Sequence, residues 1–162
     1  MRVFKPFMGA LACALLSFSA AGKDLAGRVG VGFNNEFSNS TSSRQVPALS
    51  LKYGVSKSVH AQGVLGFHTV SPAAFTFGGK LYKNIFYETN LNFHLGAALA
   101  YLKDTRGAIE LMGLFGAEFF IPGVDSLGLL FEAGVSGSNV TGTFALKTVG
   151  FTFIHAGMHF YF

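Results

Sequence analysis

The chain has 162 residues, of which 50% are hydrophobic and only 12% are charged, and its mean hydropathy is +0.43. This length suits one domain, and a charged share of about half the usual one is atypical of a soluble helical bundle. The net charge of +4 includes Arg2 and Lys5, so the rest of the chain is nearly balanced and nucleic-acid binding is not expected. With 21 Gly and 19 Phe, the composition favours a thin-walled β structure that faces lipid.

The N-terminal residues 1–21 have the features of a secretory signal peptide. Arg2 and Lys5 form its positive region, and residues 7–18 form an apolar stretch that is shorter than the roughly 20 residues of a membrane-spanning helix. Small residues at 19–21 provide a cleavage site, which places the start of the mature chain at Gly22 to within one residue. The sequence therefore predicts Sec-type export.

Cys13 is the single cysteine and lies inside this segment. Residues 10–13 loosely resemble a lipoprotein acceptor site, but the apolar stretch before Cys13 is very short and apolar residues continue after it. Cleavage after Ala21 would leave a mature chain without cysteine, and hence without disulfides or thiol chemistry.

The remaining chain contains no apolar run of 18 residues, but apolar and polar positions alternate with a period of two. A closed β-barrel has this pattern in a membrane, because backbone groups pair between strands while side chains alternate between lipid and lumen. The first strand is expected over residues 25–33, with Val29, Val31 and Phe33 facing outward. The further residues expected to face outward are, in chain order, Leu49, Leu51, Tyr53, Val59, Ala61, Leu65, Phe67, Phe75, Phe77, Leu81, Leu91, Phe93, Leu95, Ala97, Leu99, Ile109, Leu111, Phe115, Phe119, Leu127, Leu129, Phe131, Val135, Ile154, Ala156, Met158, Phe160 and Phe162.

Every charged residue within an expected strand falls on an inward position, and the other charges fall at connections or strand ends. A Lys or Arg at the lipid midplane costs roughly 2–4 kcal/mol, so this sorting indicates which side chains face the lumen. The inward set also contains apolar Met112, Leu114 and Leu130. The polar network predicted for the lumen comprises Arg28, Lys52, Lys80, Glu110, Glu118, Glu132, His60, His94 and His155.

The connections are expected to alternate in length, with short periplasmic turns at 54–58, 83–88 and 122–126. The segments near 35–46, 71–74, 103–107 and 137–145 would face outside. Residues 22–162 divided by eight give about 17–18 residues per strand and connection, which suits strands of about 9–11 residues. The alternative is that residues 91–102 and 108–121 form buried helices, but their glycines are unfavourable in helix interiors. The expected fold is an all-β, eight-stranded, antiparallel up-and-down transmembrane β-barrel.

The last strand carries a resemblance to a known family. Residues 151–162, FTFIHAGMHFYF, end in Phe with apolar or small residues at every second position, and so resemble the C-terminal signal of outer-membrane β-barrels. Residues 116–134, GAEFFIPGVDSLGLLFEAG, resemble the penultimate hairpin of small outer-membrane barrels similar to the transmembrane domain of outer membrane protein A. The resemblance implies a bacterial outer-membrane barrel of Gram-negative type. It also implies that the barrel assembly machinery reads Phe162, Phe160 and Met158. It implies no single activity.

The leading functional hypothesis is a monomeric structural or surface-interaction protein that contacts outer-membrane lipids and lipopolysaccharide and acts through its outer loops. A small channel or transporter is the alternative, followed by an enzyme that modifies lipid A or phospholipids. Ser136, His155 and Glu132 come nearest to a catalytic triad, but all three take inward positions, away from lipid. His155 and His159 would lie about 13 Å apart on a strand, which does not suit a metal site. We therefore expect no enzyme activity, no cofactor and no metal.

Overall fold

The structure is a computed structural model that describes residues 22–34, 48–69, 71, 73–103, 107–139, 143–148 and 155–162. The expected signal peptide lies outside these ranges, as do the whole loop near 35–46 and the outward position Ile154. The described residues contain no helix that is both long enough and apolar enough to cross a bilayer.

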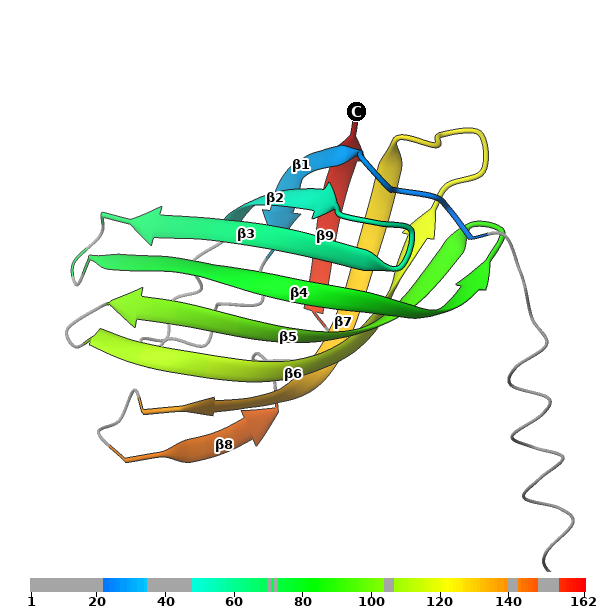
Figure 1. Cartoon of the computed structure of the whole chain (residues 1–162). Helices are drawn as coiled ribbons and strands as arrows, with labels where there is room; N and C mark the ends of the chain where they lie inside the picture. Colours follow the sequence, from blue (N-terminus) through cyan, green and yellow to red (C-terminus); the bar gives the residue numbers. More distant parts are fainter. Residues whose placement is uncertain are drawn as a thin grey trace, which may run out of the picture.

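The described residues form nine strands in one closed antiparallel sheet (Figure 1). Each strand from β1 to β7 pairs with the next strand along the chain, and β9 closes the barrel between β7 and β1. The strands are β1 (Val29–Asn34), β2 (Ala48–Gly54), β3 (Val59–His68), β4 (Ala74–Glu88), β5 (Leu91–Lys103), β6 (Gly107–Phe120), β7 (Leu127–Ser138), β8 (Ala145–Thr148) and β9 (His155–Tyr161).

Strands β8 and β9 share the eighth position of the barrel. β8 pairs with β7 over residues 135–138, and β9 pairs with the same strand over 127–132. Two β7 residues, Ala133 and Gly134, separate these paired stretches, whereas residues 149–154 separate β8 from β9 along the chain. The prediction of an eight-stranded up-and-down barrel is therefore confirmed, with its last strand in two pieces.

The two ends of the barrel differ in their connections. At one end, which we call the turn end, short connections at 55–58, 89–90 and 121–126 join the strands, and the C-terminus lies there too (Figure 1). At the other end, the loop end, the connections are 35–47, 69–73, 104–106 and 139–144. If the barrel is inserted as outer-membrane barrels are, the turn end faces the periplasm.

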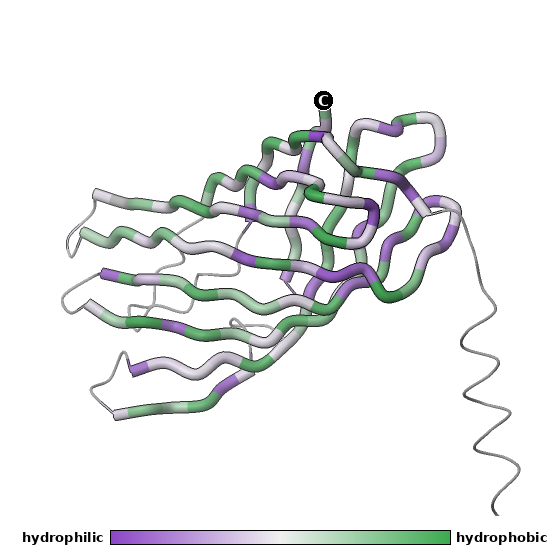
Figure 2. Tube along the Cα trace, in the orientation of Figure 1, coloured by the Kyte–Doolittle hydropathy of each residue, from purple (hydrophilic) through white to green (hydrophobic). Residues whose placement is uncertain are grey.

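The alternation predicted from the sequence is present along the strands. On β2, Leu49 and Leu51 are 67% and 56% exposed, whereas the alternate residues Ser50 and Lys52 are only 4% and 2% exposed. Figure 2 shows hydrophobic positions interleaved with less hydrophobic or hydrophilic ones along several other strands. The outer surface of the barrel is therefore apolar, and the polar side chains lie inside.

The first strand begins four residues later than expected, at Val29 instead of residue 25. The Asp24 carboxylate accepts a hydrogen bond from the backbone N–H of Ala26, and Gly27 has a φ of 75°. Asp favours such local turns, and a positive φ interrupts the strand conformation. Residues 22–28 therefore leave the barrel wall.

The connection expected at 83–88 is wrong, because β4 continues to Glu88 and the turn lies at Thr89 and Asn90. The pairing register between β4 and β5 shifts between Asn84 and Phe86, and this bulge absorbs the irregular spacing that resembled a turn. Lys83 consequently lies inside a strand and is exposed on its outward side. The expectation that every charge within a strand faces inward therefore fails at Lys83, close to the turn end.

Candidate functional site: a polar belt in the lumen

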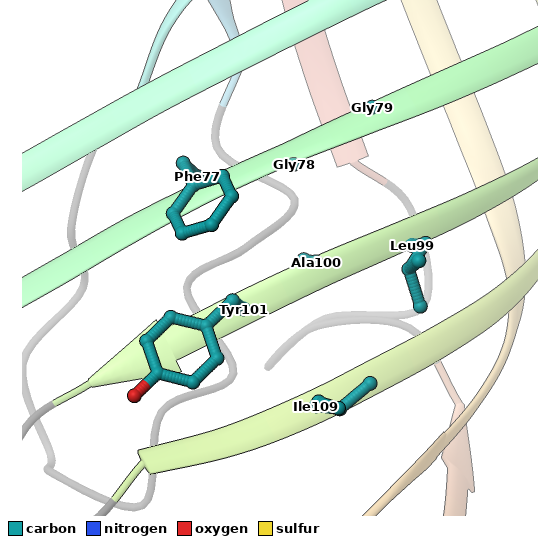
Figure 3. Close-up of a pocket in the computed structure, with 7 residues that line it drawn as sticks. All are labelled: Phe77, Gly78, Gly79, Leu99, Ala100, Tyr101 and Ile109. Carbon is teal, nitrogen blue, oxygen red and sulfur yellow. The ribbon is translucent and has the colours of Figure 1, made fainter.

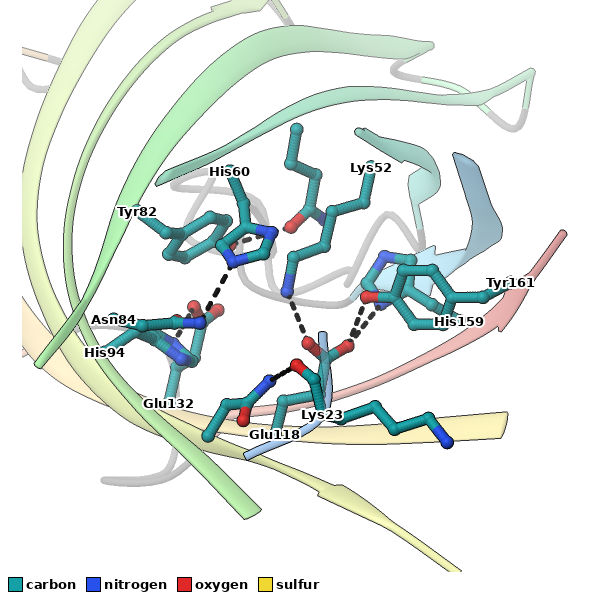
Figure 4. Close-up of polar contacts among 12 residues, drawn as sticks. Lys23, Lys52, His60, Tyr82, Asn84, His94, Glu118, Glu132, His159 and Tyr161 are labelled. Atoms are coloured by element: carbon teal, nitrogen blue, oxygen red, sulfur yellow. Dashed lines mark hydrogen bonds and ion pairs between the residues drawn. The ribbon is translucent and has the colours of Figure 1, made fainter. Parts of the chain in front are cut away.

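The lumen contains a layer of polar side chains, which we call the inner polar belt. Each member is at most 4% exposed, so the belt is shielded from both ends of the barrel. The belt residues come from β2 to β7 and β9 and are Ser50, Lys52, Gln62, Lys80, Tyr82, His94, Glu118, Glu132, His159 and Tyr161. Figure 4 shows contacts of seven of them, namely Lys52, Tyr82, His94, Glu118, Glu132, His159 and Tyr161.

Glu118 is the centre of one half of the belt. Its Oε2 lies 2.7 Å from Lys52 Nζ, and its Oε1 accepts a hydrogen bond of 2.5 Å from the Tyr161 hydroxyl (Figure 4). His159 Nδ1 lies 3.8 Å from the same Oε1, and its Nε2 shares a hydrogen bond of 2.8 Å with Ser50 Oγ. One buried carboxylate thus joins side chains from two other strands, β2 and β9.

Glu132 is the centre of the other half. Lys80 Nζ donates to its Oε2 at 2.9 Å, and His94 Nε2 donates to its Oε1 at 3.1 Å. The Tyr82 ring packs against His94 with the ring centroids 4.8 Å apart, and its hydroxyl donates to Gln62 Oε1 at 2.7 Å. This half is therefore also bonded to several strands at once.

Tyr82 connects the two halves. Lys52 Nζ lies 4.9 Å from the centroid of its ring, and Lys80 Nζ lies 5.8 Å from it. The negative face of an aromatic ring attracts cations, and a desolvated contact of this kind is worth about 2 kcal/mol. Tyr82 therefore lies within cation–π distance of both buried lysines, one from each half of the belt.

Strand β1 contributes no polar side chain to the belt, and the Tyr161 ring of β9 fills the space beside it. A Cβ at Gly30 would lie 2.7 Å from the ring of Tyr161, so only glycine leaves room for that ring. Because Tyr161 occupies this space, the belt extends around the whole barrel wall. An eight-stranded barrel has an interior that side chains can fill, and here the belt closes it.

The predicted network residues are not all brought together. Lys52, Lys80, Glu118, Glu132 and His94 lie in the belt. The other four lie elsewhere.

His60 is buried beside the belt, where its Nε2 accepts a hydrogen bond of 3.0 Å from the Asn84 amide. His155 is buried on β9, opposite Glu132 in the strand register. Glu110 lies toward the loop end, with its Oε1 3.8 Å from Lys147 Nζ.

Arg28 lies at the mouth of the turn end, where its guanidinium donates to the backbone oxygens of Asp125 and Tyr161 at 3.4 and 3.2 Å. These contacts of Arg28 are with backbone oxygens at the barrel mouth, outside the belt.

The residues that form the predicted C-terminal signal lie on the outer surface. Met158 and Phe160 point outward from β9 with 38% and 46% exposure, and Phe162 follows the strand with 73% exposure. The N–H of Phe162 donates to the backbone oxygen of Val29 at 2.9 Å, which fixes the end of the chain to β1. Recognition of these residues by the assembly machinery stays a prediction.

Two arrangements have the composition of a catalytic triad. In the one considered from the sequence, Glu132 instead binds Lys80 and His94. In the other, Ser50 and His159 share a hydrogen bond, but 3.8 Å from His159 to Glu118 is too long for a hydrogen bond. Ser50 is also only 4% exposed, so a dissolved substrate does not reach its hydroxyl. The arrangement serves to pair buried polar groups.

Five belt residues were not among the network residues predicted from the sequence, namely Ser50, Gln62, Tyr82, His159 and Tyr161. Each of them has the inward parity, so parity was the signal that could have found them. These residues belong to the belt because the strand register places them at the same level along the barrel axis. The sequence alone does not give that register.

Among the described residues, no group of three His, Cys, Asp or Glu side chains is placed to hold a metal ion. The described residues also form shallow hollows on the outer surface. One of about 410 Å³ lies where Gly78 and Gly79 leave a gap beside Phe77, Leu99 and Tyr101 (Figure 3). Its lining is apolar apart from the hydroxyl group of Tyr101.

No protein-family model matches the chain, and no curated protein matches it in sequence. Among solved structures, the chain is similar to the N-terminal β-barrel domain of OprF from Pseudomonas aeruginosa. The TM-score is 0.54 at 11% sequence identity, and the match covers 83% of this chain and 96% of that domain. The chain thus has the fold of the small outer-membrane β-barrels that are similar to outer membrane protein A.

Proposed function

We propose that the chain is a bacterial outer-membrane protein with a sealed lumen, whose role is structural or lies in surface interactions of its loops at 35–46 and 137–145. The observation that carries the proposal is the inner polar belt. Its two lysines and two glutamates neutralise one another inside the barrel, and its aromatic rings occupy the space between them. A lumen filled in this way leaves the two outer surfaces, lipid-facing and loop-end, for function.

The outward surface supports insertion in a bilayer. Large apolar side chains with exposures of about one third to three quarters cover it on every strand, including Leu49, Leu81, Leu111 and Val135. An apolar surface of this extent would not be stable in water, whereas lipid chains cover it in an outer membrane.

The first experiment tests location and folding. We expect the processed protein in the outer-membrane fraction after Sec-dependent export, with a different gel mobility before and after boiling. Recovery of a periplasmic, soluble protein with unchanged mobility would contradict the proposal.

The second experiment separates the structural role from surface interactions. In a deletion strain, we expect increased sensitivity to detergent or reduced attachment to other cells. Complementation with a chain in which residues 139–144 are replaced by a short Gly-Ser linker should restore envelope integrity but not attachment. Replacement of turn 55–58, at the opposite end of the barrel, is the matched control and should restore both.

A measurement of conductance tests the sealed lumen directly. We expect no discrete conductance steps when the purified barrel is added to planar bilayers. Steps that are changed by Glu118→Gln would identify the belt as the lining of an ion path and would favour the channel instead.

A further inference from the structure

The segment before the first strand crosses the mouth of the barrel at the turn end. Residues 22–28, which we call the N-terminal strap, start beside β5, where the Asn92 side chain donates to the backbone oxygen of Lys23 at 2.9 Å. They end at the start of β1, where Gly27 N–H donates to the backbone oxygen of Gly54, at the end of the neighbouring strand β2, at 2.8 Å. β5 and β1 are four positions apart in a barrel of eight strands, so the strap runs from one side of the mouth to the other (Figure 1).

Leu25 fills the mouth from the middle of the strap. Its side chain is 1% exposed and packs in a cluster with Phe120 and Tyr161. Tyr161 belongs to the inner polar belt, so Leu25 covers the belt on the side of the turn end. Lys23 adds an ion pair of 2.8 Å with Asp125 in the connection between β6 and β7.

The start of the strap lies in a tight and polar place. A Cβ at residue 22 would lie 2.5 Å from both Asn92 Oδ1 and the Tyr87 ring, so only glycine fits there. Asn92 is 1% exposed, and its Oδ1 accepts no hydrogen bond from the residues that the structure describes. A buried amide oxygen without a donor is costly, which indicates that a donor belongs at this place.

We propose that the mouth of the turn end is a binding site for the chain's own processed N-terminus. Hydrolysis of the peptide bond between Ala21 and Gly22 by an export peptidase consumes one water. It leaves a carboxylate on Ala21 and an α-ammonium on Gly22. The α-ammonium donates to Asn92 Oδ1. The N-terminal strap is thereby held across the mouth, and the buried Leu25 side chain closes the barrel at the turn end.

The chemistry of the N-terminus explains why processing matters. Before cleavage, the nitrogen of Gly22 is an amide with a single N–H whose direction is set by the preceding peptide. After cleavage, it carries three N–H donors that rotate freely and a positive charge, which makes the hydrogen bond to an amide oxygen stronger. This inference goes beyond the proposed function, because it requires no activity of the loops.

The experiment is acylation of the α-amine in the purified, processed barrel, folded in detergent, with an amine-reactive ester near neutral pH. An α-amine loses its proton at lower pH than a lysine does, so it reacts selectively. Mass spectrometry of the N-terminal peptide gives the site and rate. We expect a chain that begins at Gly22, and labelling about tenfold or more slower in the folded barrel than in urea, the factor for one charge-assisted hydrogen bond.

Two substitutions at one position should act in opposite directions. Asn92→Leu keeps the branched shape of the side chain but has no acceptor, and we expect it to increase the labelling rate about tenfold. Asn92→Asp places a carboxylate beside the ammonium and should slow labelling below the rate of the unchanged chain. Asn90→Leu, at the turn of the same hairpin, is the matched control and should leave the rate unchanged.

Gly22→Ala provides a test that changes no residue of the barrel strands. The added methyl group clashes with Asn92 and Tyr87, so the N-terminus should leave its site and be labelled faster, while the heat-dependent mobility of the barrel stays the same. The proposal is overturned if the folded and unfolded chains are labelled at equal rates. It is equally overturned if Asn92→Leu and Asn92→Asp change the rate in the same direction, or if the mature chain starts at another residue.

Discussion

The two halves of the lumen are closed in different ways. Toward the turn end, the inner polar belt fills the barrel with paired charges and hydrogen bonds around Glu118 and Glu132. Toward the loop end, a cluster of small or apolar side chains fills it, namely Ala48, Val64, Ala98, Ala100, Met112 and Leu114. Both halves are buried, but the first depends on specific partners and the second depends on volume.

This difference determines how each half tolerates change. A buried charge that loses its partner keeps its full desolvation cost, whereas an apolar cluster responds to the amount of space that is added or removed. We therefore expect the belt to be sensitive to single substitutions and tolerant of matched double substitutions. The apolar cluster should be sensitive to size alone.

The largest effect is expected when one half of a buried ion pair is removed. Glu132→Leu leaves Lys80 buried with no carboxylate 2.9 Å away, and should lower the free energy of unfolding by about 3–5 kcal/mol. Urea unfolding in lipid vesicles measures this change. The double variant with Lys80→Met should recover most of the loss, because apolar residues of similar volume replace a buried pair at little cost. Additive losses in the double variant would show that the two side chains do not interact.

A smaller effect is expected from a single hydroxyl. Tyr161→Phe keeps the ring against Leu25 and Phe120 but removes the hydrogen bond to Glu118. Hydrogen bonds to charged groups contribute about 1.5–3 kcal/mol, so unfolding should become easier by that amount in the same vesicles. An unchanged stability would mean that water replaces the hydroxyl and that the belt is open to solvent.

In the apolar half, added volume should be unfavourable. Ala100→Leu introduces a larger side chain into the closed interior, and overpacking of this kind costs about 1–3 kcal/mol. Ala97→Leu adds the same atoms on the lipid-facing side of the same strand and is the matched control, with little expected change. Equal effects of the two variants would indicate that the loop half of the lumen has spare room.

The smallest changes in stability are expected when two buried serines are replaced by alanine. Ser136 Oγ makes no hydrogen bond to the residues that the structure describes, so Ser136→Ala should leave stability unchanged or raise it by up to about 1 kcal/mol. Ser50 is bonded to His159, and Ser50→Ala should lower stability by about 1 kcal/mol. Equal destabilisation of both variants would contradict the distinction between a buried serine with a hydrogen-bond partner and one without a partner among the described residues.

The sequence was sufficient to predict the barrel because alternation is a property of each strand alone. The positions of Lys52, Lys80 and Glu132 relative to their apolar neighbours gave their side of the wall without any knowledge of pairing. The number of strands followed from the chain length that one crossing requires. These predictions failed locally at Lys83, where a bulge replaced the expected turn.

The pairs within the lumen could not be predicted from alternation. Lys52 and Glu118 are separated by 66 residues, and they meet only because the tilt and register of the strands bring them to the same height. The N-terminal strap was also missed, because Leu25 has the spacing of a strand residue and enters the mouth only through the turn at Gly27. Register and long-range packing are therefore the parts that required coordinates.

The division of the eighth strand has a consequence for how the cylinder is sealed during assembly. β9 joins β1 only over residues 157–161 opposite 30–34, whereas the seam between β4 and β5 runs from Phe75 opposite Lys103 to Glu88 opposite Leu91. In the part of the chain that the structure describes, the pairing between the first and last strands is thus short and contains few backbone hydrogen bonds. When the sheet closes into a barrel in a bilayer, we expect the β1–β9 pair to form last. On unfolding, we expect the same pair to separate first.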